Sequence, residues 1–363
     1  MGFFKSFIKQ LVEEGHQVDI ACNETVSAVP DCYREWGCSV YPISCSRSPL
    51  NKGNLTAIRQ LRSIVKEGGY ELVHCHTPIA AMCTRLACRP LRKRGVKVFY
   101  TAHGFHFYKG APLKNWLLYY PAEKLCSYFT DVLITMNQED YSLALKKMKA
   151  KRVEYVPGVG IDTQRFMLSE EERAEKRKII RQRHGIPETA KLLLSVGEVN
   201  ENKNHGVVIE ALSKLDLEDV YYIICGQGPM MDERKALAQK LGLGERVVFA
   251  GYRNDVPDYY QAADIFVFPS FREGLPVSVM EAMASGLPVI CSNIRGCTDL
   301  VEDGTNGFLI NKDDVRSLSS VIGRLLEEKT LCSNFGEASQ KLIKGFCIET
   351  VIEKMKALYN PVL

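Results

Sequence analysis

The chain has 363 residues, of which 46% are hydrophobic and 25% charged, so it is long enough for two ordinary globular domains. No apolar run reaches the ~20 residues that cross a bilayer. The 13 cysteines are scattered, with neither the density of a disulfide scaffold nor the spacing of a zinc site. We therefore expect reduced cysteines and a cytoplasmic protein without a metal.

The charge is unevenly spread along the chain. Residues 1–157 hold 22 Lys and Arg against 13 Asp and Glu, a net charge of +9, which leaves −5 for the remainder. A basic half fits an anionic partner such as a phosphate or a membrane surface. Nucleic-acid recognition needs a reading motif or aromatics interleaved with a basic stripe, and neither occurs. Nucleic acid is therefore not an expected partner.

Helices and strands are expected to alternate through the first half of the chain. Apolar residues recur at helical spacing over residues 3–12 and again over 55–65. Short apolar runs predict strands at 18–21, 71–74, 96–101, 132–135 and 153–156. Such alternation is typical of an α/β domain whose parallel sheet is covered on both faces.

The same alternation restarts after Pro157-Gly158 and a charged helical segment at 169–183. Strands are expected at 192–196, 221–225, 247–249, 265–268 and 288–290. We therefore predict two doubly wound, Rossmann-like domains over 1–158 and 187–345, with a linker at 159–186. A C-terminal helix at 346–363 should pack back on the first domain. Ligands of such sheets bind beyond the carboxyl ends of the strands, so the expected site is a cleft that both domains face.

The first predicted helix has no strand before it. A doubly wound domain normally opens with a central strand and a glycine-bearing loop. The first domain thus lacks its expected first strand, and we expect the natural reading frame to extend about 15–20 residues upstream.

Two glycine-containing segments follow predicted strands in the second half. In VGEVNENKNH (196–205), Gly197 allows a tight turn and Lys203 stands where a helix begins, which suits a phosphate. In CGQGPM (225–230), Gly226 and Gly228 would let the backbone approach a ligand closely. The alternatives are a solvated surface lysine and an ordinary strand-to-helix turn.

The segment PSFREGLPVSVMEAMASGLPVI (269–290) places two glutamates beside one strand end. Glu273 lies in the loop and can reach a sugar hydroxyl, whereas Glu281 lies inside the next helix and can accept from both hydroxyls of a ribose. The free N–H groups of that helix start, with Gly274, can donate to a diphosphate. Taken alone, both carboxylates could also be solvated surface groups.

Together these segments resemble glycosyltransferase family 4. Glu273 and Glu281 reproduce its E-x7-E signature, and VGEVNENKNH, CGQGP, GYRNDV (251–256) and PGVGIDTQRF (157–166) follow in the family's order and spacing. TAHGFHFYKGAP (101–112) resembles the bacterial exopolysaccharide and capsule branch. The resemblance covers nearly the whole chain.

The resemblance implies a GT-B fold and a metal-independent, retaining transfer from a nucleotide diphosphate sugar, with UDP as the expected nucleotide. It implies that Lys203 holds the pyrophosphate and Glu281 the ribose. Glu273 would hold the donor sugar, aided by the backbone amides of Gly274 and Leu275. No cofactor is expected.

The resemblance also assigns the base and the reacting centre. Gly251, Tyr252 and Arg253 would line the base, and His103 matches the family histidine near the reacting centre. The first domain would bind the acceptor, a glycan or a lipid-linked sugar. His103 could alternatively be a histidine at the edge of the core.

Glu198 departs from the family pattern. The family commonly has a basic residue directly after the glycine of this loop, and a carboxylate there repels a diphosphate. We expect the side chain of Glu198 to contact sugar hydroxyls or to point elsewhere. Lys203 then carries more of the charge, and Arg272 is a conceivable helper.

The acceptor side contains a basic and aromatic region. Residues 113–125 mix tryptophan, tyrosines and leucines with two lysines, and residues 85–97 carry six Lys and Arg. These features suit an anionic membrane surface or the pyrophosphate of a lipid-linked acceptor, which predicts a protein peripheral to the inner face of the plasma membrane. The alternative is a core-packed helix beside a basic loop.

Two other functions remain open from the sequence. One is a nucleotide-sugar epimerase or hydrolase, because a fold does not define a reaction. The other is a catalytically dead protein that binds sugar nucleotides within a polysaccharide assembly complex. The E-x7-E spacing favours the transferase.

Overall fold

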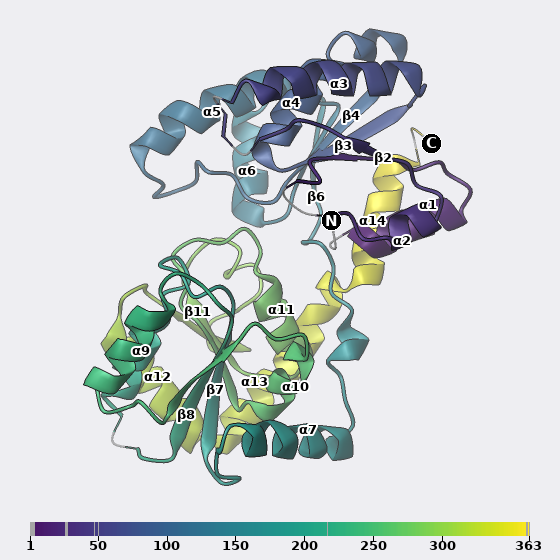
Figure 1. Cartoon of the computed structure of the whole chain (residues 1–363). Helices are drawn as coiled ribbons and strands as arrows, with labels where there is room; N and C mark the ends of the chain where they lie inside the picture. Colours follow the sequence, from purple (N-terminus) through teal and green to yellow (C-terminus); the bar gives the residue numbers. More distant parts are fainter. Residues whose placement is uncertain are drawn as a thin grey trace. The chain divides into compact units, whose positions relative to one another are not determined.

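The computed structural model describes residues 4–25, 28–46, 48–49, 51–215, 217–360 and 362 (Figure 1). The chain forms two compact units. The first unit comprises Met1–Gly160 and Val351–Leu363, and the second comprises Ile161–Thr350.

The first unit is built on four parallel strands in the order β3-β4-β5-β6. Their bounds are β3 Leu72–His76, β4 Lys97–Ala102, β5 Val132–Thr135 and β6 Arg152–Tyr155. Two further strands, β1 Ile20–Cys22 and β2 Val40–Pro42, form a separate parallel pair. Helix α2 (Cys32–Glu35) lies between them in the sequence. The sequence prediction found all of these strands except β2, which is three residues long and only partly buried.

Helices cover both faces of the four-stranded sheet. On one face, α1 (Lys5–Glu13) and α14 (Ile348–Tyr359) bury Phe7, Leu11, Met355 and Tyr359 against β4 and β5. The other face is covered by α4 (Pro78–Cys88), α5 (Leu113–Ser127) and α6 (Gln138–Lys147), with α3 (Gly53–Glu67) packed on α4 and the 3-10 turn η2 (Leu91–Arg94) following it. The helix predicted from residue 3 begins at Lys5, and residues 1–3 lie outside the described part.

Of the described residues only Phe4 precedes α1. The sheets β1-β2 and β3-β6 are not paired with one another. A hydrogen bond from the Tyr70 hydroxyl to Asp19 joins the segments that lead into β1 and β3. The upstream extension stays a prediction.

The second unit contains one sheet of six parallel strands in the order β12-β11-β10-β7-β8-β9. The bounds are β7 Lys191–Val196, β8 Val220–Cys225, β9 Val247–Gly251, β10 Ile265–Phe268, β11 Val289–Ser292 and β12 Gly307–Ile310. Only β12 was missing from the sequence prediction.

The helices of this unit divide between the two faces of its sheet. One face carries α8 (His205–Leu212), α9 (Met231–Lys240) and α12 (Val315–Glu327). The opposite face carries α10 (Val256–Ala262), α11 (Val277–Ala284) and the 3-10 turn η4 (Ile343–Phe346). Helix α13 (Lys329–Leu342) contacts both α11 and α12.

Residues 161–186, predicted as part of a linker, belong to the second unit. They contain the 3-10 turn η3 (Thr163–Arg165) and α7 (Glu170–Arg183), whose start is closed by a capping box between Ser169 and Glu172. Helix α7 packs on α10, and Arg181 is buried against Asp264 at 3.1 Å. The sequence predicted the charged helix but could not assign it to the second unit, because a buried arginine cannot be distinguished from an exposed one without its partner.

The order of the strands defines a switch point in the second unit. From β7 the chain adds β8 and β9 on one side, and then returns to place β10 against the other side of β7. The loops after β7 and β10 therefore leave in opposite directions, which opens a ligand site at the carboxyl ends of these two strands.

Candidate active site

The loop after β7 carries Lys203 to the start of α8. Asn204 is the N-terminal cap of α8 and has a left-handed backbone, with φ 51°. The backbone N–H of Lys203 donates to the side chain of Asn200 at 3.0 Å, and the side chain of Lys203 runs back over Gly197. A Cβ at Gly197 would lie 3.1 Å from Cε of Lys203, so a glycine leaves room for the lysine.

Gly226 and Gly228 have a packing role. A Cβ at Gly226 would lie 1.8 Å from the carbonyl oxygen of Gly197, and one at Gly228 would lie 2.3 Å from that of Val199. The N–H of Val199 also donates to the carbonyl of Gln227 at 3.0 Å. The two loops thus support each other backbone to backbone, whereas the sequence prediction explained these glycines by a ligand. Direct contact with a donor stays a prediction for both.

Lys203 and Glu273 meet at the switch point. The Nζ of Lys203 lies 2.8 Å from Oε1 of Glu273 and 4.4 Å from the centre of the Phe268 ring. The amide of Asn202 donates to the same carboxylate oxygen at 3.3 Å. The two charged side chains are only 19% and 15% exposed, so water screens their interaction weakly. Two candidates 70 residues apart therefore form one charged centre.

Arg295 supports this centre and was missed by the sequence analysis. It lies in the loop after β11, is buried, and its Nε donates to the carbonyl oxygen of Glu273 at 3.0 Å. The next residue, Gly296, packs so closely on the Gly274–Leu275 backbone that a Cβ would lie 2.1 Å from the Gly274 carbonyl. Neighbouring parallel strands end at the same edge of a sheet, so a cation in the loop after the strand predicted at 288–290 is expected near the other loops of the site. That position could have identified Arg295.

Glu281 lies in α11, which begins after its cap Pro276. The hydroxyl of Tyr260 lies 2.9 Å from its Oε2, and no described residue hydrogen-bonds to its Oε1. Burial raises the pKa of Glu281. One oxygen is thus held by tyrosine while the other remains to accept from a ligand. Tyr260 was not predicted, because its contact depends on how α10 packs against α11.

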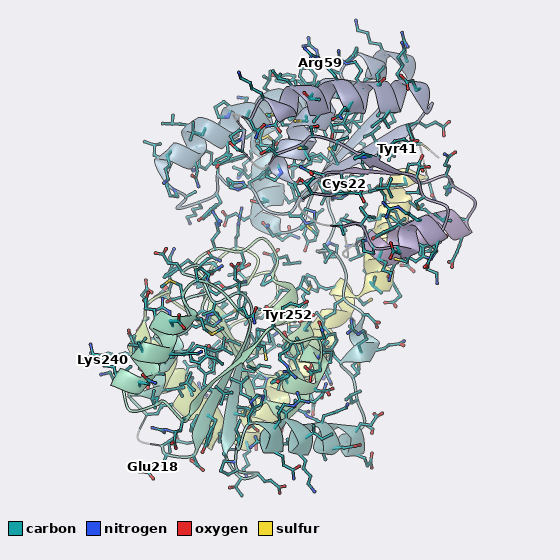
Figure 2. The ribbon with its side chains drawn as sticks, in the orientation of Figure 1. Cys22, Tyr41, Arg59, Glu218, Lys240 and Tyr252 are labelled. Carbon is teal, nitrogen blue, oxygen red and sulfur yellow. The ribbon has the colours of Figure 1, made fainter. Side chains whose placement is uncertain are left out.

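The predicted base-binding residues lie at the carboxyl end of β9. Tyr252, which is labelled in Figure 2, is 73% exposed, whereas Arg253 makes two hydrogen bonds to Asp255 at 2.9 and 3.0 Å. These bonds hold the pKa of Asp255 well below its usual range. Gly251 has φ 72° and its carbonyl accepts from the N–H of Gly226 at 2.8 Å. The Tyr252 ring is available to stack on a base, whereas the Arg253 side chain is already held by Asp255.

Glu198 is bound to a neighbouring side chain of its own loop. It is exposed, and its Oε2 accepts from the amide of Asn200 at 2.9 Å. Arg272 is exposed as well. Leu275 packs against the core beside α11.

His103 belongs to the first unit, directly after β4. Its Nε2 lies 3.3 Å from Nδ1 of His76, and burial lowers its pKa, so the ring is neutral at neutral pH. Within the described residues no group of three or more His, Cys, Asp or Glu side chains is arranged to hold a metal.

Two Rossmann-like units, with a lysine and two glutamates around the switch point of the second, are the arrangement expected of a glycosyltransferase of the GT-B fold, and the comparisons with known proteins agree. The chain belongs to glycosyltransferase family 4. The family described as Glycosyltransferase Family 4 matches residues 3–165, and that described as Glycosyl transferases group 1 matches residues 176–342.

Named relatives and a solved structure agree with this membership. The chain is 37% identical to the putative glycosyltransferase EpsD of Bacillus subtilis over 99% of its own length and 92% of the relative's. It is 28% identical to the Escherichia coli UDP-Gal:alpha-D-GlcNAc-diphosphoundecaprenol alpha-1,3-galactosyltransferase, over 96% and 90%. The fold is similar to Anabaena Alr3699/HepE in complex with UDP, with a TM-score of 0.82, 19% identity, and 99% and 96% of the chains covered. In the part of the chain that is described, no helix is long and apolar enough to cross a membrane.

Proposed function

We propose that the protein transfers a sugar, with retention of configuration, from a UDP-sugar to a glycan or lipid-linked acceptor in exopolysaccharide or capsule synthesis. The observation that carries this proposal is the pairing of Lys203 with Glu273 at the switch point, beside the start of α11. The names of the two relatives, one an EpsD and one a UDP-galactose-dependent enzyme with a diphosphoundecaprenol-linked acceptor, support the acceptor class and the nucleotide.

The chemistry follows from the charges at this point. As the bond to the leaving UDP breaks, negative charge develops on the diphosphate, and preorganised positive groups there are usually the largest catalytic contribution. The Lys203 ammonium and the unpaired N–H groups at the start of α11 supply such groups. Glu273 keeps the lysine oriented before the donor binds, and afterwards accepts a hydrogen bond from a donor-sugar hydroxyl.

Product analysis tests this function directly. The protein is incubated with UDP-sugars and lipid-linked or glycan acceptors, and the products are analysed by mass and by the anomeric configuration of the new linkage. The expected product is the acceptor plus one sugar with the donor's configuration. Epimerised or free sugar without acceptor would identify an epimerase or hydrolase, and intact donor with every acceptor would identify a binding protein.

Removing the charge of Glu281 and of Glu273 should change different kinetic quantities. Glu281→Gln should weaken donor binding about 10- to 100-fold, since a hydrogen bond to a charged group contributes ~1.5–3 kcal/mol. Glu273→Gln should mainly lower kcat, because its partner Lys203 acts on the leaving group. Calorimetric titration with the donor and steady-state kinetics separate the two effects, and the opposite assignment would mean that the roles are exchanged.

The donor affinity should also depend on pH through Glu281. Its raised pKa means that the carboxylate takes up a proton at a higher pH than an ordinary glutamate and then has one acceptor fewer. As the pH falls, the dissociation constant should therefore begin to rise at a higher pH than an ordinary glutamate would cause. The same titration of Glu281→Gln isolates this contribution, because a glutamine does not titrate; an equal pH dependence in both proteins contradicts it.

Transfer should not require a divalent metal. In the proposed function Lys203 and the start of α11 stabilise the diphosphate, as a metal does in other transferases, so treatment with EDTA should leave kcat/KM within about twofold of the untreated value. Loss of activity with EDTA that returns on adding Mg²⁺ or Mn²⁺ would contradict this prediction.

We further propose that α5 rests on an anionic membrane surface, which would place the enzyme at the inner face of the plasma membrane. Leu113, Leu117 and Leu118 are 67–73% exposed, and Pro121 and Leu125 extend the same helix face. The aromatics of this segment, Trp116, Tyr119 and Tyr120, pack against the core instead. The membrane-facing groups are thus the leucines, whereas the sequence could not separate them from the buried side of the helix.

The cations beside α5 also divide into two groups. Arg92 makes two hydrogen bonds to Asp131, at 2.9 and 2.8 Å, so it is a structural residue and not part of a free basic surface. Lys93 and Arg94 are exposed, and Lys124 and Lys147 both lie over the Tyr120 ring. Arg92 also donates to the carbonyl of Tyr128, so η2 lies at the C-terminal end of α5, and cations next to an exposed apolar helix face are typical of binding to anionic lipid.

Lys93→Gln with Arg94→Gln should weaken binding to phosphatidylglycerol vesicles about tenfold or more, since each surface cation contributes about 1 kcal/mol. Leu117→Ser with Leu118→Ser should weaken it as well, and binding should fall between low and physiological salt. Leu55→Ser, a change at a leucine 63% exposed on α3, is the matched control. Co-sedimentation that is unaffected by salt and by both double variants would reject this proposal.

A further inference from the structure

Three histidines lie on one face of the first unit's sheet. His74 and His76 are two residues apart in β3, and the register pairs His74 with Phe99 and His76 with Thr101. Side chains alternate along a strand, so both histidines share a face with Thr101 and with His103 just beyond it. The row runs from the core to the carboxyl edge of the sheet.

The innermost histidine is held at both ring nitrogens. Nδ1 of His74 contacts the Tyr359 hydroxyl of α14, and its Nε2 lies 2.8 Å from the hydroxyl oxygen of Thr101. Burial lowers its pKa to about 3. His74 is therefore a neutral, structural part of the core.

The ring of His76 contacts two other rings, those of Phe4 and His74. The centroids of Phe4 and His74 both lie 4.2 Å from that of His76. Its Nδ1 faces Nε2 of His103 at 3.3 Å. Because burial lowers the pKa of both histidines, each carries a single ring proton at neutral pH, and only one of the two facing nitrogens can donate. The tautomers of the pair are therefore coupled, and His76 influences which nitrogen of His103 remains an acceptor.

The backbone directly after His76 is strained. Thr77 has φ 61° and ψ 137°, a conformation that a β-branched residue adopts at a cost, and Pro78 then begins α4. Such strain persists where the surrounding structure imposes it and is concentrated at functional sites. Here the strained turn comes where β3 delivers His76 to His103.

We propose that His76 is a positioning residue that fixes the ring orientation and tautomer of His103 for sugar transfer. The inference rests on the proposed function and on the family resemblance, which implies that His103 lies near the reacting centre. His76 acts through His103 and needs no contact with either substrate.

Two variants of similar size test this role. His76→Asn keeps a polar atom at the position of Nδ1, whereas His76→Leu does not, and both lose the stacked ring. We expect His76→Leu to lower kcat about 10- to 100-fold with the donor KM within about twofold, the scale of a misplaced catalytic group. His76→Asn should retain most of the wild-type kcat. The two variants should have similar melting temperatures.

A second measurement does not depend on turnover. Nitrogen chemical shifts of the histidine rings report the tautomer, and those of His103 should change in His76→Leu but much less in His76→Asn. Equal kcat in both variants, or an unchanged His103 tautomer, overturns the proposal. If the wild type transfers no sugar, the proposed function fails, and the nitrogen shifts still decide whether His76 controls His103.

Discussion

Lys203→Ala should lower kcat/KM by about 10²–10³-fold, the usual cost of removing one group that stabilises charge in a transition state. The lysine is the cation paired with Glu273, it is mostly buried, and the neighbouring position 198 carries a glutamate turned towards Asn200. Steady-state kinetics with the donor and acceptor measure the loss. Most of it should appear in kcat, because the diphosphate charge develops as the bond breaks.

Lys240→Ala is the matched control for this prediction. Lys240 is an exposed lysine at the end of α9 (Figure 2), so its loss should leave kcat/KM unchanged. The double variant Lys203→Ala with Glu273→Gln should be less impaired than the two separate losses combined, since contacting residues are coupled. Activity of Lys203→Ala within a few-fold of wild type would show that Lys203 does not stabilise the diphosphate.

Glu123→Ala should destabilise the first unit by about 3–5 kcal/mol, the range for leaving one partner of a buried ion pair uncompensated. Arg85 is 1% exposed, its Nη1 lies 2.9 Å from Oε2 of Glu123, and its guanidinium lies 4.2 Å from the centre of the Tyr100 ring. Removing Glu123 leaves this cation away from water without its carboxylate. Urea unfolding followed by circular dichroism measures the change.

An exposed ion pair supplies the comparison. Lys9 and Glu13 lie 3.5 Å apart on α1 with side chains 54% and 62% exposed, so Glu13→Ala should cost about 0.5 kcal/mol or less. Replacing both buried partners, as in Arg85→Met with Glu123→Leu, should recover most of the stability lost in Glu123→Ala. Equal destabilisation by Glu123→Ala and Glu13→Ala would show that burial does not set the cost.

Hydrophobic runs alone located most of the strands. β5 and β10 have the predicted bounds, because all four residues of each are buried and apolar apart from one threonine. β2 and β12 were missed because they contain Pro42 and Gly307, which weaken a strand signal, and because neither is buried along its whole length. Complete burial thus made the bounds of a strand predictable, and the sequence also predicted partly exposed strands such as β6 with less accurate bounds.

The candidate site was predicted residue by residue, but its connections were not. Lys203, Glu273 and Glu281 could be identified because they follow strand ends in a recognisable order. Their partners Arg295 and Tyr260 come from other loops and helices, and the register of β7, β10 and β11 brings them together.

The basic segment 85–97 shows most clearly which properties follow from the sequence and which from the tertiary structure. Its residues determine by themselves that the first half is positively charged. Only the tertiary structure decides that Arg85 and Arg92 are bound to Glu123 and Asp131, 38 and 39 residues away, while Lys93 and Arg94 stay exposed. The physical reason is that the solvent and the carboxylates around a cation decide whether it is paired or exposed. Those surroundings are set by the packing of α4 and α5 rather than by the neighbours in the chain.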